Sequence, residues 1–343
     1  MPKTARNLWP MVYAFANVHD AWKSAARGRH DREYVMRFEQ NLEANLFDLI
    51  DRLKNRTWAP GKWTVFSVYE PKKRIIHAPQ FKDRVAHHAV VRVIQPYFES
   101  RFIEDSYACR AFKGTHAASN RLLEMLRQCS RNGTTYFIKA DIAKYFPNIQ
   151  HDILMRQAAR TIGDRDVLWF LSRAMQVEGY DGVGLPIGAL PSQLLANVYL
   201  DPFDHFMKDK MGVRYYLRYM DDFIVVHNDK SYLKLLLDTI RQWLGDNLKL
   251  EMNRKTGIGA MVNGVDFAGY RHWATHKLPR KKNVARAKRV FRKLRSLYET
   301  GCIDLEDVRP VVASFCGYMK HCSGYRTCGS MLVSNCKNFE HYS

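Results

Sequence analysis

The sequence predicts an α+β fold built around an antiparallel sheet, and three observations support this prediction. Two strand-forming runs, residues 213–217 and 223–226, flank the adjacent acids Asp221-Asp222 at the point where a hairpin would turn. A third apolar run, residues 136–140, also ends at an acid, Asp141. Elsewhere apolar residues recur at spacings of three and four, which is typical of amphipathic helices.

The composition describes a folded protein with an anionic partner. With 343 residues, of which 46% are hydrophobic, the chain can bury a large core and hold two or three subdomains. Its 54 Lys+Arg against 34 Asp+Glu give a net charge of +20, which favours nucleic acid and salt-sensitive binding. A membrane surface is the alternative partner. We expect none, because no apolar run is long enough to span a bilayer and the start of the chain is not a signal peptide.

The cysteines indicate a reducing compartment. They are seven in number and include no Cys-x-x-Cys, so neither a disulfide framework nor a standard zinc site is expected, and a cytoplasmic location fits. Five of them fall in the last 42 residues, where ordinary thiols are favoured over a metal or redox cluster. These five are Cys302, Cys316, Cys322, Cys328 and Cys336.

Residues 1–62 are expected to form an N-terminal helical extension. A tryptophan-containing segment and a basic connector at residues 23–30 come first. A helix follows, because apolar residues repeat along one face until the turn at residues 58–61. The residues of that face are Phe38, Leu42, Leu46, Leu49 and Leu53.

A β-hairpin is expected next, over residues 63–77, and its connection at residues 70–73 carries positive charge. A helix then opens at residue 81 and runs towards Pro96.

The loop at residues 106–116 contains two cations, Arg110 and Lys113, and leads into a helix at residues 117–129. Solvated surface cations are one interpretation of this loop. In the company of the acids Asp141 and Asp221 we favour a phosphate-binding loop, because cations in such a loop can hold phosphates.

Further helices are expected near residues 149–160 and from Ser192 onwards. Between them lie a glycine-rich bend and the Gly/Pro turns of residues 184–191. Small residues at this loop-to-helix transition allow a nucleobase or the backbone of a nucleic acid to come close. Helix capping by Ser192 is an alternative that is compatible with this role.

The C-terminal part is predicted to be helical and basic. A helix at residues 232–244 is followed by a turn at 245–247, and residues 264–270 indicate a strand pair with a tight bend. Residues 271–300 hold eleven Lys/Arg and one acid, Glu299, on an amphipathic helical pattern. A solvated face is the usual explanation of such a run, but the lack of balancing acids favours phosphate contact.

The three aspartates predict a metal site. Adjacent carboxylates beside buried strands repel each other and lose hydration unless a cation neutralises them. Mg²⁺ fits best, because it is hard and prefers oxygen ligands. Asp141 with Asp221 and Asp222 could bind two ions about 3.5 to 4 Å apart, as in phosphoryl transfer. A solvated polar turn is the alternative for an Asp-Asp pair.

The turn Tyr219-Met220-Asp221-Asp222, with the strand that ends at Asp141, resembles the palm of a reverse transcriptase. The similarity covers roughly residues 60–275, with the motifs in the expected order. It implies a right-hand polymerase fold, with fingers and an antiparallel palm sheet at residues 63–272 and a short, basic helical thumb at residues 273–343. It also implies catalysis by Asp141, Asp221 and Asp222, with a two-Mg²⁺ site that comprises these acids and Ile142.

The resemblance implies further roles. Phe146, five residues past Asp141, matches the bulky residue that excludes a ribose 2′-OH, and Lys255 matches the basic residue near the departing pyrophosphate. The residues expected to bind dNTP are Arg74, Arg110, Phe146, Gln193 and Lys255. Those expected to contact nucleic acid are Lys113, Gly188, Ser192, Tyr219, Gly269, Tyr270, Lys281, Lys282 and Arg289.

Residues 187–193 refine the resemblance. Many reverse transcriptases have Gln-Gly-x-x-x-Ser-Pro there, whereas Ile187-Gly188-Ala189-Leu190-Pro191-Ser192-Gln193 resembles the enzymes of diversity-generating retroelements. In that family the pattern accompanies error-prone copying of template adenines, with an accessory protein and a structured template RNA. The expected protein is thus a bacterial or phage-encoded, cytoplasmic RNA-directed DNA polymerase. Its partners are template RNA, dNTPs, the cDNA product and a small accessory protein.

Three alternatives remain open. Defence-associated bacterial reverse transcriptases, which copy a neighbouring noncoding RNA, have a similar core. A catalytically idle RNA-binding scaffold would keep the fold without the activity. A template-independent terminal transferase or an RNA polymerase would synthesise without template or prefer NTPs.

Overall fold

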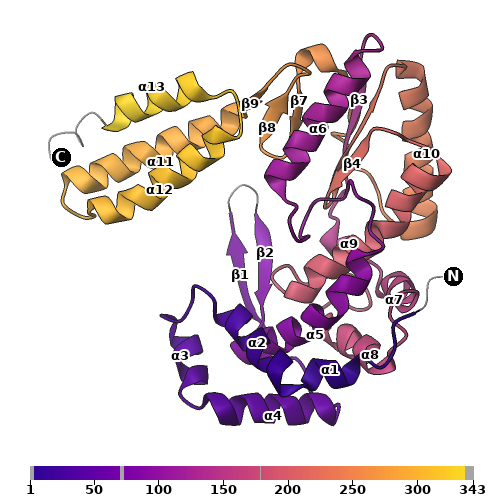
Figure 1. Cartoon of the computed structure of the whole chain (residues 1–343), viewed down its shortest axis with the longest axis vertical. Helices are drawn as coiled ribbons and strands as arrows, with labels where there is room; N and C mark the ends of the chain where they lie inside the picture. The colour runs from indigo at the N-terminus through magenta and orange to yellow at the C-terminus, as the bar shows by residue number, and fades with distance from the viewer. Residues whose placement is uncertain (1–3, 70–72, 178, 337–343) are drawn as a thin grey trace. The chain divides into compact units, whose positions relative to one another are not determined.

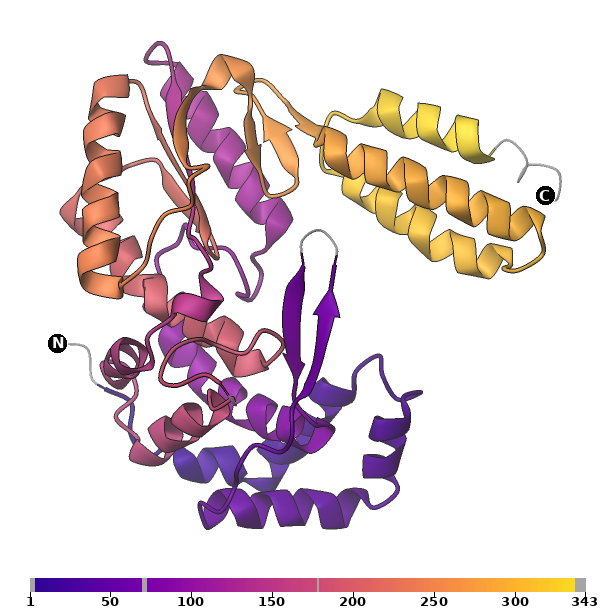
Figure 2. The ribbon, with the colours of Figure 1, turned by 180° about the vertical axis from the view of Figure 1, so that it is seen from behind.

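The computed structural model of the chain describes residues 4–69, 73–177 and 179–336, and it forms two compact units (Figures 1 and 2). Unit 1 comprises Met1–Arg110, Asp141–Gly212 and Asp238–Arg254, and unit 2 comprises Ala111–Ala140, Val213–Leu237 and Lys255–Ser343. The division at residues 62 and 272 expected from the sequence stays a prediction.

Unit 1 begins with four helices, α1 (Trp9–Tyr13), α2 (Phe15–Ala26), α3 (Glu33–Glu39) and α4 (Leu42–Lys54). The single helix expected around residues 38–53 is therefore wrong, because the chain breaks at Gln40-Asn41. The Asn45 amide donates to the Phe38 carbonyl at 2.9 Å, which satisfies an acceptor that the break exposes. The predicted apolar face is nevertheless largely buried, with Leu46, Leu49 and Leu53 in the core.

The predicted hairpin is present as β1 (Thr64–Val68) and β2 (Arg74–Ala78), which pair antiparallel with Phe66 opposite Ile76. Residues 70–72 of its connection lie outside the described residues. Helix α5 (Phe81–Glu99) continues through Pro96 and packs against α2 and α9 (Leu190–His205).

Unit 1 also contains the short helix η1 (Phe146–Asn148) and the helices α7 (His151–Ala159) and α8 (Arg165–Ala174). Helix α8 was not predicted from the sequence. The sequence does contain a start signal for this helix, because Asp164 is an N-cap residue whose side chain accepts from the amides of Asp166 and Val167. After α9 the chain continues as the π-helical turn η2 (Phe206–Lys210).

The sheet of unit 2 has the strand order β4-β5-β3-β6. Its strands are β3 (Tyr136–Asp141), β4 (Tyr216–Tyr219), β5 (Asp222–His227) and β6 (Gly257–Ala260). The β4–β5 and β3–β6 pairs are antiparallel, and α6 (Thr115–Ser130) packs on β4 and β5. Because β3 is hydrogen-bonded to β5, the strand that ends at Asp141 is the neighbour of the strand that begins at Asp222.

Helix α10 (Lys230–Leu248) runs through the turn expected at residues 245–247, so that prediction is wrong. Asn247, expected in the turn, donates its side-chain amide to the Trp243 carbonyl at 2.9 Å, four residues earlier. A side chain typical of turns here supports the last turns of a helix instead.

A second sheet of unit 2 consists of β7 (Val265–Phe267), β8 (Tyr270–His272) and β9 (Lys277–Pro279), next to the short helix η3 (Met261–Asn263). The basic helix starts only after β9, as α11 (Lys281–Glu299). It lies side by side with α12 (Leu305–Lys320) and α13 (Tyr325–Cys336) in a bundle (Figures 1 and 2). The bundle has its own core of Phe291, Phe315, Met319 and Met331.

The α+β class and the antiparallel sheet predicted from the sequence are confirmed. Within residues 4–69, 73–177 and 179–336, no helix combines the length and the apolar character that crossing a membrane requires.

Candidate active site

The acidic turn, Tyr219–Asp222, connects β4 to β5 with Met220 and Asp221 between the paired residues Tyr219 and Asp222. Met220 has a φ of 57°, in the left-handed region that two-residue hairpin turns use. Asp221 and Asp222 are partly exposed, whereas residues 223–226 behind them are buried. The hairpin therefore presents two adjacent carboxylates on a rigid, apolar base.

Two neighbours brace the acidic turn. The Arg218 side chain is 0% exposed, and its Nη1 donates to the Met220 carbonyl at 2.9 Å. The Tyr219 hydroxyl is 3.2 Å from Thr115 Oγ1 at the start of α6. Tyr219, predicted to contact nucleic acid, thus has a hydrogen-bond partner that fixes its ring beside the acids.

Asp141 is held by the segment that follows α10. Its carbonyl accepts from the Asn253 amide at 2.7 Å, and its Oδ2 accepts from Asn253 Nδ2 at 3.1 Å. The next residue, Ile142, bridges to Met252 and is 2% exposed. Because the Ile142 side chain is apolar and buried, only its main chain could serve the metal site predicted for it.

The backbone around Phe146 is constrained. Lys144 has a φ of 44°, and the Tyr145 hydroxyl donates to the Ala196 carbonyl. The Phe146 carbonyl accepts from the Leu185 amide at 2.9 Å, and its partly buried ring lies 5.6 Å from that of Tyr145. A bulky side chain fixed in this way suits the predicted exclusion of a ribose 2′-OH.

Three of the predicted dNTP-binding side chains are accessible. Arg74 at the start of β2, Gln193 on α9 and Lys255 are all exposed.

Arg110 does not fit its predicted contact with a triphosphate. Its side chain is only 7% exposed, and Nε pairs with Glu99 Oε2 at 2.7 Å. Nη1 donates to the carbonyls of Ile103 and Ser106 at 2.6 and 2.9 Å. The guanidinium instead ties the 103–110 loop to the end of α5, which corrects the prediction.

Gly188 and Ser192 have packing roles. Gly188 has a φ of 122°, and a Cβ there would lie 2.8 Å from the His77 carbonyl of β2. The Ile187 carbonyl accepts from the His77 amide at 2.8 Å, so this close approach needs glycine. Ser192 is 2% exposed and lies inside α9, whose N-cap is Ala189. Ser192 thus neither caps the helix nor reaches a nucleic acid with its side chain, contrary to prediction.

The tight bend predicted within residues 264–270 is the turn Ala268-Gly269, which joins β7 to β8 with φ values of 46° and 86°. The Gly269 carbonyl accepts from the Tyr318 hydroxyl at 2.6 Å and from Asn283 Nδ2 at 3.2 Å, which ties this turn to α11 and α12. Tyr270 is 0% exposed, and burial raises the pKa of its hydroxyl. The Tyr270 side chain does not reach a nucleic acid, because the ring stacks on Tyr318 inside the protein, and a contact through its main chain stays a prediction.

The basic residues predicted to contact nucleic acid on α11 are accessible. Lys281, Lys282 and Arg289 are exposed, and Lys113 before α6 is partly exposed. The apolar side of α11 packs on the bundle core through Val284, Ala287 and Leu294, and the contact of its exposed cations with nucleic acid stays a prediction.

The oxygen donors of the acidic turn fit Mg²⁺. This ion is commonly held by one or two carboxylates, completed by waters and substrate phosphates. Among the residues that the structure describes, no group of three His, Cys, Asp or Glu is gathered as a metal cage. Two adjacent, partly exposed carboxylates are the arrangement that a substrate-completed site needs.

Known proteins share sequence and fold with this chain. Residues 67–272 match the family model described as reverse transcriptase (RNA-dependent DNA polymerase). Protein YkfC of Escherichia coli K12 is 26% identical over 248 residues, which cover 60% of this chain and 65% of YkfC. The group II intron-encoded protein LtrA of Lactococcus lactis is 25% identical over 175 residues, which cover 48% of this chain and 28% of LtrA.

Among solved structures, apo telomerase from Candida tropicalis, truncated from its C-terminal domain, superposes with a TM-score of 0.51 at 14% identity. The match covers 67% of this chain and 58% of that chain and supports the predicted right-hand polymerase fold. The chain spans less than two thirds of the length of each of these three proteins. The family match over residues 67–272, together with the acidic turn and the sheet order, shows that this chain belongs to the reverse transcriptase (RNA-dependent DNA polymerase) family.

Proposed function

We propose that the chain is an RNA-directed DNA polymerase that extends a primer 3′-OH with dNTPs on an RNA template. One observation carries the proposal. The strand that ends at Asp141 is the sheet neighbour of the strand that begins at Asp222, within the segment that matches the family. Acids at the ends of adjacent strands can share a metal-bound substrate.

In this proposal Asp141, Asp221 and Asp222 hold two Mg²⁺. When bound, these ions lower the pKa of the 3′-OH and balance charge on the triphosphate and the leaving pyrophosphate. The protein supplies position and electrostatics. Arg74 and Lys255 bind phosphate oxygens, Phe146 selects the deoxyribose, and the rigid β4–β5 hairpin keeps the acids in place.

A paired-acid variant tests the polymerase proposal. Changing Asp221 and Asp222 together to Ala should abolish primer extension, by about a thousandfold or more, because the metal donors of the turn are lost. RNA binding, measured by fluorescence anisotropy, should stay near the wild-type value. The matched control is Asp238→Ala with Asp246→Ala, which removes two exposed acids of α10. Persistent dNTP incorporation by the first variant would overturn the assignment.

We propose further that the polymerase serves a diversity-generating retroelement and copies a structured RNA with errors at template adenines. The support is the sequence of residues 187–193, together with the packing of Gly188 against β2, which fixes the backbone of that segment. A cytoplasmic bacterial or phage setting and a small accessory protein belong to this proposal. A defence-associated enzyme that copies a neighbouring noncoding RNA is the alternative.

Sequencing of the cDNA made in the native host separates these two roles. Substitutions concentrated at template adenines would support diversification. A faithful or repetitive copy of a neighbouring noncoding RNA would contradict it and favour defence.

A further inference from the structure

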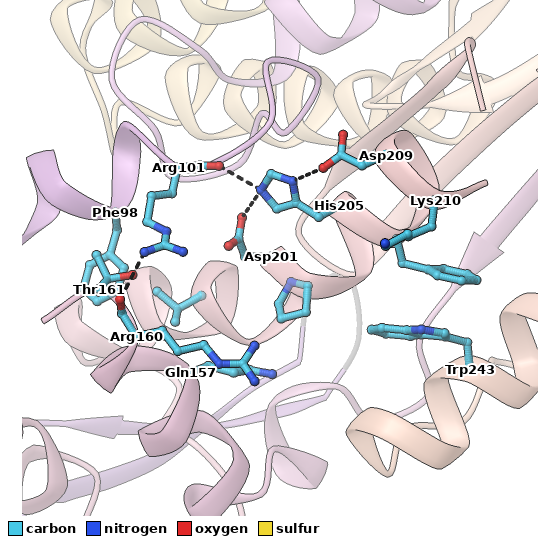
Figure 3. A pocket seen from close by; sticks show the side chains of 13 residues that line it. Phe98, Arg101, Gln157, Arg160, Thr161, Asp201, His205, Asp209, Lys210 and Trp243 are labelled. Atoms are coloured by element: carbon cyan, nitrogen blue, oxygen red, sulfur yellow. Dashed lines mark hydrogen bonds and ion pairs between the residues drawn. The ribbon is translucent and has the colours of Figure 1, made fainter. Parts of the chain in front are cut away.

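Unit 1 contains a cavity of about 400 Å³ that the proposed polymerase chemistry does not use (Figure 3). It lies between the end of α5, the end of α7, helix α9 with its continuation η2, and α10. Phe98 and Val198 form an apolar part of its lining. We refer to it as the α9 cavity.

One wall of the α9 cavity is aromatic. The rings of Phe206 and Trp243 stack with centroids 4.9 Å apart and planes at 18°. Phe206 starts the π-helical turn η2, in which the Met211 amide donates to the Phe206 carbonyl at 2.9 Å, five residues back. Single π-helical turns are frequent at functional sites. This one brings Phe206, Asp209 and Lys210 together on the lining.

The charge of the lining is positive. His205 faces acceptors with both ring nitrogens, Nδ1 at 2.6 Å from Asp209 Oδ2 and Nε2 at 3.0 Å from the Arg101 carbonyl (Figure 3). Burial opposes protonation of His205, but Asp209, Asp201 and that carbonyl outweigh it and raise its pKa. Three cations, Arg101, Arg160 and Lys210, face two acids, Asp201 and Asp209, so the lining carries a net charge of about +1 before any proton on His205 is counted. Such a lining favours an anionic ligand.

The lining includes an amide oxygen that has no hydrogen-bond donor within the described part of the chain. Gln157 Oε1 is buried at the cavity and finds no hydrogen-bond donor among the residues that the structure describes. A buried acceptor without a donor is unusual in a folded protein and is satisfied when a ligand supplies an N–H group. The lining of the α9 cavity is thus complementary to a ligand that combines negative charge, a flat ring and an N–H donor.

We propose that the α9 cavity binds a nucleotide. Its base would stack on the Trp243–Phe206 wall, as bases do on aromatic side chains, and donate to Gln157 Oε1. Its phosphate would be bound by Arg160 and Arg101, whose guanidinium Nη1 already donates to the Arg160 carbonyl at 3.1 Å. The ligand is either a free nucleotide or one unstacked nucleotide of a bound RNA. This site does not depend on the proposed polymerase activity.

Calorimetric titration with AMP tests the proposal. The protein carries Asp221→Ala and Asp222→Ala, and the buffer lacks Mg²⁺, so that binding at the candidate active site is suppressed. AMP should bind, and adenosine and inorganic phosphate should each bind at least about tenfold more weakly, because each lacks one half of the recognition. No AMP binding at about 1 mM ligand would overturn the proposal.

Two variants locate the site. Arg160→Ala should weaken AMP binding about tenfold or more, and Gln157→Leu should weaken it less, because it removes a neutral acceptor. The matched control is Arg165→Ala, an exposed arginine of α8 outside the lining. If Arg160→Ala and Arg165→Ala bind AMP equally, the α9 cavity is not the site.

A single-stranded RNA of about ten nucleotides distinguishes the two sources of the nucleotide. RNA that displaces AMP from the unaltered cavity, and loses affinity with Arg160→Ala, identifies an RNA contact. AMP binding that persists at saturating RNA identifies a free nucleotide. Both results support a nucleotide site.

Discussion

Asn253 holds Asp141 by two hydrogen bonds, from its main-chain amide to the Asp141 carbonyl at 2.7 Å and from Nδ2 to Oδ2 at 3.1 Å. The Ala143 amide extends this ladder to the Glu251 carbonyl at 2.8 Å. The first acid of the proposed metal site is therefore oriented by the segment that leads into Lys255.

Asn253→Ala should weaken Mg²⁺ binding and slow primer extension about tenfold, because a hydrogen bond to a charged group contributes roughly 1.5 to 3 kcal/mol. The main-chain hydrogen bond remains in this variant, so the fold should be kept. The measurement is a Mg²⁺ titration of primer extension, with Mn²⁺ binding followed by electron paramagnetic resonance as a readout without turnover. Asn247→Ala, which removes an amide at the end of α10, is the control. Equal Mg²⁺ dependence in both variants would show that Asn253 does not orient Asp141.

Phe146→Ala should admit NTPs. The constrained backbone around Phe146 holds its ring in place, and truncation leaves room for a 2′-OH. We expect the ratio of kcat/KM for dCTP over CTP to fall at least about tenfold, while dCTP use changes little. Phe47→Ala, at an exposed phenylalanine of α4, should leave the ratio unchanged. A Phe146→Ala enzyme that still rejects CTP would contradict the gate role.

Gly188→Ala should destabilise unit 1 by about 2 kcal/mol or more, because a φ of 122° strains alanine and its Cβ would lie 2.8 Å from the His77 carbonyl. Gly212→Ala separates the two causes, since Gly212 has a φ of 61° with nothing near its Cβ. The Gly212→Ala control should lower the free energy of unfolding by only about 1 kcal/mol. Urea denaturation of both variants measures the difference, and equal losses would argue against the close contact with β2.

Tyr318→Phe should weaken retention of the primer–template. The variant keeps the ring stacked on Tyr270 at 4.8 Å but loses the hydroxyl that donates to the Gly269 carbonyl. We expect KM for primer–template to rise several-fold with a smaller change in kcat, and stability to fall by about 1 kcal/mol. Tyr325→Phe, at a side chain that is 89% exposed, is the control. A fall in kcat alone would place Tyr318 outside primer binding.

His87 should make the protein less stable in acid. Burial, followed by the charges of His88 and Arg84, lowers the pKa of His87 to about 3 from 6.5. The unfolded chain therefore takes up a proton at His87 as the pH falls below 6.5, whereas the folded chain does not. Above pH 6.5 the neutral His87 costs no stability. Between pH 6.5 and pH 4 the free energy of unfolding falls by about 3 kcal/mol because of this proton uptake.

His87→Leu should flatten the pH dependence of unfolding between about pH 6.5 and 4, because it removes that proton uptake. Neither ring nitrogen of His87 has a hydrogen-bond partner in the described part of the chain, so leucine should be tolerated at neutral pH. The measurement is urea denaturation across this pH range. An unchanged slope would mean that His87 is protonated in the folded state.

Local pattern predicted the elements whose signals lie within a few residues. The β1–β2 and β4–β5 hairpins and the basic helix α11 have clear periodicity, and the structure contains them. Prediction failed where distant contacts decide. Residues 277–279 look helical but form β9, because Lys277 Nζ reaches Asn120 Oδ1 at 2.6 Å and the strand pairs with β8.

The candidate site was predictable in residue type but not in side-chain direction. Arg110 and Tyr270 occupy the expected motifs. However, the Arg110 guanidinium is paired with Glu99, and the Tyr270 ring is stacked on Tyr318 inside the protein. Asn253 and Tyr318 were missed because their partners lie 112 and 49 residues away in the sequence. The spacing of residues within one segment gives no indication of contacts between such distant residues.

The most direct measurement is the incorporation of labelled dNTPs into a DNA primer annealed to RNA. The wild-type protein should make cDNA complementary to the RNA, only with a divalent ion, and Asp141→Asn should make none. Product that forms without template, product from Asp141→Asn, or none from the wild type would contradict the assignment of Asp141, Asp221 and Asp222 to RNA-templated DNA synthesis.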